Sequence, residues 1–176
     1  MEIKGETFLY TLAGLMITFA GFTALLLAVR PASGARLSLL DKYLAKTIMT
    51  HLFVLAGGAL MPPLFALYDI QGPWIWRDSA VLFALPMLFL QLSYPYRRRK
   101  AIGQAPPPAI LAVFVALGAA VTLAALVYVL DGLPYSAAAY ITALTVDFCT
   151  VTYAFVVALE VILRQPLETS DRSAPR

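Results

Sequence analysis

Cysteine and histidine are almost absent: Cys149 and His51 are single occurrences in 176 residues. A lone cysteine excludes an intramolecular disulfide and any cluster of thiolates around a metal. A lone histidine excludes the paired-histidine zinc motif, and the chain contains neither a Gly-x-Ser-x-Gly elbow nor a Walker loop. The sequence therefore predicts no metal, no cofactor and no recognisable enzyme class.

Charged side chains are also scarce, at 13% of the chain against 61% hydrophobic residues. A soluble domain of this composition would lack the polar surface needed to cover its core. A helix of about 20 residues crosses the roughly 30 Å hydrocarbon core of a bilayer. Five continuous apolar runs approach or exceed this length, over residues 8–29, 47–68, 79–94, 109–130 and 136–163. We therefore predict an all-α membrane protein, with one five-helix transmembrane bundle over residues 1–164 and a disordered cytoplasmic tail over 165–176.

The basic residues lie almost entirely on one side of the predicted spans. Of the 13 lysine and arginine side chains, all but Lys4 and Arg77 flank the same ends of the runs. Cytoplasmic segments retain such residues, which predicts the N-terminus outside and the C-terminus inside. The densest group directly follows the third run and predicts a topology anchor on anionic lipid headgroups rather than a nucleic-acid site: Arg97, Arg98, Arg99 and Lys100.

Small residues form a stripe in two of the runs. In the first run the stripe comprises Thr11, Gly14, Thr18, Gly21 and Leu25; in the fourth it comprises Ala112, Ala116, Ala120 and Ala124. Such faces allow membrane helices to approach each other closely. The stretch TLAGLMITFAGFTALLLAVR (11–30) resembles the first helix of small, uncharacterised bacterial multi-pass membrane proteins. That resemblance implies no activity, and the alanine-rich, lysine-poor composition is compatible with a bacterial inner membrane.

Prolines interrupt the second and third runs. Pro62 and Pro63 free the carbonyls of Gly58 and Ala59, and Pro86 frees that of Leu82, so we expect kinks at both places. Such carbonyls can face a substrate or an ion. In ordinary bundles, neighbouring side chains satisfy them instead, and we favour this second interpretation.

The fifth run is the most polar, and Asp147 falls near its middle. Tyr140 and Thr150 share its helical face. Burial at this depth disfavours a charged carboxylate, so Asp147 is expected to be neutral or paired. Two alternatives stay open: a group that loads a proton or binds a cation, and a protonated acid hydrogen-bonded to a Tyr or Thr of a neighbouring helix.

Four further polar residues lie within or beside the spans. His51, about one turn into the second run, either relays protons or lies at the headgroup boundary. Gln91 and Ser93 are expected to donate hydrogen bonds between helices. Glu160 is four residues before Arg164, the spacing of a local ion pair.

Three classes of function remain. The first is permeation or transport of protons, cations or small solutes through Asp147, by an oligomer, because five short spans leave little room in one protomer. The second is a non-catalytic subunit or assembly factor whose small faces and Asp147 dock partner helices. The third is an intramembrane enzyme with a diffuse signature. Expected partners are the bilayer, further copies of the chain or other membrane subunits, and no nucleic acid.

Overall fold

The computed structural model describes residues 5–32, 38–69, 72–133 and 136–163. The predicted tail over 165–176 and Arg164, the expected partner of Glu160, lie outside these ranges. Within them every regular element is a helix: α1 (Glu6–Ala32), α2 (Leu39–Leu67), α3 (Pro73–Ile102), α4 (Pro108–Ile110), η1 (Leu111–Leu117), α5 (Gly118–Leu130) and α6 (Ser136–Leu163).

Five helices in the described part of the chain are long and apolar enough to cross a membrane, with α4, η1 and α5 together forming the fourth. The prediction of an all-α fold with five membrane-length helices is therefore confirmed, as a multi-pass membrane protein requires. The α2 and α3 helices exceed the apolar runs that predicted them by the most. The α2 helix begins at Leu39, because Ser38 and Asp41 form a reciprocal capping box at its N-terminus. The α3 helix continues through the basic residues until Gly103, whose φ of 75° ends it in the left-handed conformation.

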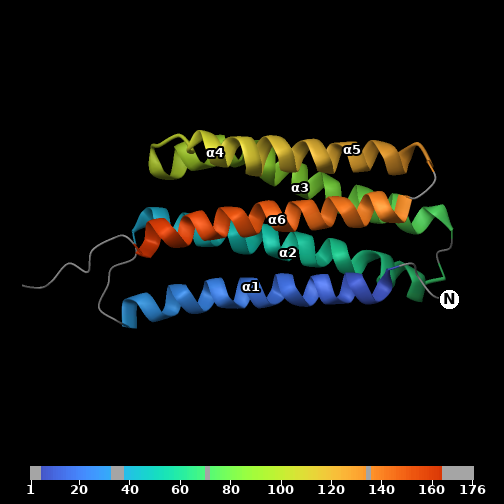
Figure 1. The fold of residues 1–176 in the computed structure, drawn as a ribbon, viewed down its shortest axis with the longest axis horizontal. Coiled ribbons are helices and arrows are strands. Elements are labelled where there is room, and N and C mark those ends of the chain that lie inside the picture. Colours follow the sequence, from blue (N-terminus) through green and yellow to red (C-terminus); the bar gives the residue numbers. More distant parts are fainter. Residues whose placement is uncertain (1–4, 33–37, 70–71, 134–135, 164–176) are drawn as a thin grey trace, which may run out of the picture.

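Four of the membrane-length helices enclose a common interior. The α2 helix packs against α3, α3 against α5 and α5 against α6, and α6 returns to pack against α2, which closes the ring. The α1 helix packs on the outside of this ring, mainly against α2 (Figure 1). The buried side chains of the interior include Leu55, Met87, Val129 and Leu144.

The ends of the helices separate the charged residues. The start of α2 and the ends of α1, α3 and α6 meet at one end of the bundle, on the left of Figure 1. We call this the basic end, because it carries Lys42, Lys46, Arg97, Arg99 and Lys100. The opposite end carries Asp69, Asp78 and Asp131. Which end faces the cytoplasm stays a prediction from these charges.

The irregular helical segment lies in the fourth span, not in the second or third, where prolines predict kinks. Helical structure is continuous through Pro62 and Pro63 in α2 and through Pro86 in α3, and the kinks there stay predictions. In the fourth span, η1 is a π-helix of 7 residues, although the sequence has no proline within it. A π turn contains more residues than an α turn, so it changes which face the following residues present.

Both predicted small faces point away from the bundle. In α1 the inward face carries Leu9 and Met16 together with Ala13 and Ala20, whereas the five residues of the predicted stripe are all exposed. A Cβ added at Gly14 or Gly21 would meet nothing within 4 Å. The four alanines of the fourth span are exposed as well. Within one protomer, these faces therefore do not serve helix packing.

Candidate functional site

Asp147 lies in the interior of the four-helix ring and is fully buried. Its Oδ1 atom accepts a hydrogen bond of 2.9 Å from Nε2 of Gln91 on α3, and its Oδ2 atom accepts one from the hydroxyl of Thr122 on α5. No lysine or arginine in the described part of the chain forms an ion pair with it. The carboxyl group is therefore held between three helices by two neutral side chains.

Gly118 makes room for this cluster. A Cβ at this position would lie 2.6 Å from Nε2 of Gln91 and 3.0 Å from Oδ1 of Asp147. Gly118 directly follows η1, and Thr122 comes one helical turn later on the same face. The π-helix thus ends where the backbone of α5 approaches the carboxylate, and π turns are frequent at functional sites.

Several buried polar atoms of the helices in the ring have no hydrogen-bond partner among the described residues. Oε1 of Gln91 is one, and Nε2 of His51 and Oγ of Ser79 are others. His51 is fully buried, with Nδ1 2.7 Å from the carbonyl of Thr47 and its ring 4.8 Å from that of Phe114. Unpaired polar atoms are costly in an apolar interior, so these groups favour a small polar partner such as water.

The carbonyl of Gly58 is not open to the interior. The hydroxyl of Tyr140 donates a 2.7 Å hydrogen bond to it, and the ring of Tyr140 packs against Trp76 and Phe83. This is the repair by a neighbouring helix that we favoured for the proline-freed carbonyls. Ala59 is buried beside Gly58, and the Leu82 side chain points outward with 52% of its surface exposed.

The side chains of the remaining predicted site residues form no hydrogen bond with the carboxyl group of Asp147 in the described part of the chain. The hydroxyl of Thr150 is buried and donates to the main-chain carbonyl of Asp147, at 2.8 Å, not to the side chain. Glu160 is exposed toward the basic end, about 20 Å from Asp147 along the axis of α6. His51 contacts Thr47 and Phe114 instead.

The interhelical role predicted for Gln91 is confirmed, whereas that for Ser93 is wrong. Ser93 donates to the carbonyl of Phe89 and accepts from Nε of Arg97, both on its own helix. The four predicted lipid anchors differ in exposure: Arg99 and Lys100 are exposed, but Arg98 is buried.

The sequence analysis missed Thr122 and Gly118. A signal for Thr122 exists, because it is the single serine or threonine in the fourth apolar run. Gly118 is likewise the single glycine of that run, but glycine is common in membrane helices and does not by itself indicate a site.

Comparison with protein-family models, curated proteins and solved structures found no match. The resemblance of the first helix to small bacterial membrane proteins stays a prediction. Among the described residues, no group of three or more His, Cys, Asp or Glu side chains could hold a metal ion.

Proposed function

We propose that the protein moves protons, or a small cation, across the membrane and that Asp147 is the group that takes up and releases the charge. The observation that carries this proposal is a fully buried carboxyl group whose hydrogen-bond partners among the described residues are the neutral side chains of Gln91 and Thr122. An arginine or lysine partner would favour the ionised form permanently. Neutral partners leave both the ionised and the protonated form of the carboxyl group accessible.

The side chains around Asp147 can hydrogen-bond either form. The ionised carboxylate accepts from Nε2 of Gln91 and from the hydroxyl of Thr122. The protonated acid has one O–H to donate, and the Thr122 oxygen and the unpartnered Oε1 of Gln91 are acceptors. The proton can therefore leave or return with only a rotation of neighbouring hydroxyl and amide groups.

Polar atoms on either side of Asp147 support a route through the ring. Toward the basic end, His51 offers its unpartnered Nε2 atom; toward the opposite end, Ser79 offers an unpartnered hydroxyl. Both side chains are fully buried within helices that surround the interior. Water molecules between such groups would complete a path for protons.

Proton flux into liposomes that contain a pH-sensitive dye tests this proposal. Wild type should acidify the lumen faster than protein-free liposomes, and D147N should return the rate to background because an amide cannot release a proton. D131N is the matched control, since Asp131 is an exposed acid at the opposite end and should leave the flux unchanged. Wild-type flux equal to the lipid background, or equal flux in D147N, would refute the proposal.

The second candidate is a non-catalytic subunit or assembly factor in the bacterial inner membrane. The observation that favours it is the outward direction of the small faces on α1 and the fourth span. Small residues let a helix of another subunit, or of a second copy, approach closely. Co-purification of a stoichiometric membrane partner, lost in G14L/G21L and accompanied by no flux, would favour this candidate over the first.

A further inference from the structure

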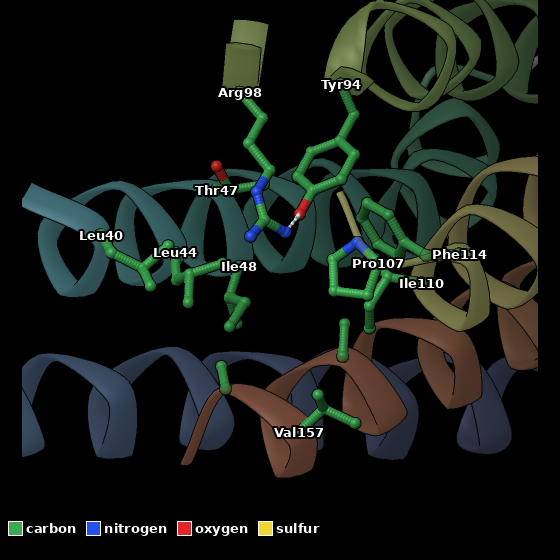
Figure 2. A pocket seen from close by; sticks show the side chains of 12 residues that line it. Leu40, Leu44, Thr47, Ile48, Tyr94, Arg98, Pro107, Ile110, Phe114 and Val157 are labelled. Carbon is green, nitrogen blue, oxygen red and sulfur yellow. Dashed lines mark hydrogen bonds between the residues drawn. The ribbon is translucent and has the colours of Figure 1, made fainter. Parts of the chain in front are cut away.

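A cavity of about 60 Å³ opens at the basic end of the bundle, between α2, α3, α4 and α6. Most of its wall is apolar. Leu44 and Ile48 contribute from α2, Phe114 from η1 and Val157 from α6 (Figure 2). Apolar walls of this kind favour a hydrocarbon segment over water.

Arg98 extends into this cavity from α3 (Figure 2). Its side chain is only 8% exposed, and Nη1 donates a 3.3 Å hydrogen bond to the hydroxyl of Tyr94. Among the described residues, its Nε atom has no hydrogen-bond partner and no carboxylate forms an ion pair with it. A buried guanidinium to which the described residues supply no counter-ion favours an anion at this site.

We propose that this cavity binds an anionic phospholipid from the leaflet at the basic end, with the phosphate on Arg98 and the first part of the chain against the apolar wall. The planar guanidinium suits phosphate oxygens. The Tyr94 hydroxyl accepts from Arg98 and keeps its own proton to donate to a phosphate oxygen.

The apolar wall distinguishes a lipid from a free phosphate ion. A hydrated ion gains only from Arg98 and the Tyr94 hydroxyl. A lipid also covers the apolar wall at Leu44, Ile48 and Val157, which a hydrated ion would leave in contact with water. This site is separate from the Asp147 cluster, so either proposal can fail without the other.

Lipid binding to the purified full-length protein in a neutral detergent tests the proposal. Native mass spectrometry should show retention of phosphatidylglycerol over phosphatidylcholine, and phosphatidylglycerol should raise the melting temperature. R98Q should weaken this retention at least about tenfold, because the amide keeps hydrogen-bond donors but loses the charge. R99Q removes an equal charge from an exposed neighbour and should bind like wild type.

A second variant acts on the wall without changing Arg98. Ala154 lines the cavity, and A154L should lower phosphatidylglycerol retention by filling the space, which decides the matter if R98Q does not fold. Equal losses in R98Q and R99Q would attribute binding to surface charge and overturn the proposal. Stabilisation by inorganic phosphate alone, equal to that by the lipid and dependent on Arg98, would also overturn it.

Discussion

Nε2 of Gln91 lies 2.9 Å from Oδ1 of Asp147 and joins α3 to α6 across the interior of the bundle. Thr122 joins the same carboxyl group to α5. Three helices therefore share one polar cluster in an interior that is otherwise mainly apolar. In a membrane such a cluster stabilises one arrangement of helices and also provides a place where a proton can reside.

Removing the hydroxyl of Thr122 tests the structural part of this relationship. T122V should destabilise the protein by about 1 kcal/mol, because the carboxyl group loses a partner in an apolar interior. Thermal unfolding in detergent micelles measures the change. T18V is the control, since the exposed Thr18 hydroxyl bonds only to the carbonyl of Gly14 in its own helix. Equal stability of T122V and wild type would contradict a clamping role.

Two glycines that differ only in their surroundings offer a second test. G118A should destabilise the protein by about 1–3 kcal/mol, because its Cβ would lie within 3.0 Å of both Gln91 and Asp147. G14A should be neutral or slightly stabilising, since a Cβ there meets nothing within 4 Å and alanine favours the helix. Unfolding midpoints of the two variants, measured side by side, give the comparison. A tolerated G118A would mean that the cluster is looser than its geometry implies.

Tyr140 should be important for stability through its hydroxyl group. Y140F keeps the packing against Trp76 and Phe83 but leaves the carbonyl of Gly58 without its donor. A loss of about 1–2 kcal/mol is expected in the same unfolding measurement. Y153F removes a hydroxyl from a half-exposed ring and should change little. Equal stability of Y140F and Y153F would mean that another group donates a hydrogen bond to the Gly58 carbonyl.

His51 should affect transport more than stability. H51F keeps a planar ring against Phe114 but removes the unpartnered Nε2 atom. On the proposed route, proton flux in liposomes should fall about tenfold or more, because no other titratable group replaces the imidazole. F53H adds an imidazole to an exposed neighbouring position and should not restore the flux in the H51F background. Unchanged flux in H51F would exclude His51 from the route.

Capping and helix-ending residues predict parts of the fold well. Ser38 and Asp41 mark the start of α2, and Gly103 ends α3 where the chain turns. The π-helix over Leu111–Leu117 has no such signal, because apolar residues without proline or glycine are equally compatible with a regular α-helix. Local sequence preference therefore does not predict it.

The candidate site was predicted in part. Asp147 can be identified from the sequence because its carboxyl group lies in the middle of an apolar run. A charge at that depth is costly whichever way the side chain points. Its partners Gln91 and Thr122 lie 56 and 25 residues away, respectively, and only the pairing of helices brings them together. Arg98 has the same composition around it as Arg99, yet one is buried and the other exposed.

The sequence by itself determined the class of the protein and the number of membrane-length helices, because bilayer thickness sets the length of an apolar run. Tertiary structure decided which face of each helix points inward. In water, an apolar face must be buried, so hydrophobicity predicts direction. In a bilayer, lipid and protein interior are both apolar, so the small residues of α1 can point outward and Asp147 can meet Gln91 without any change in hydrophobic pattern.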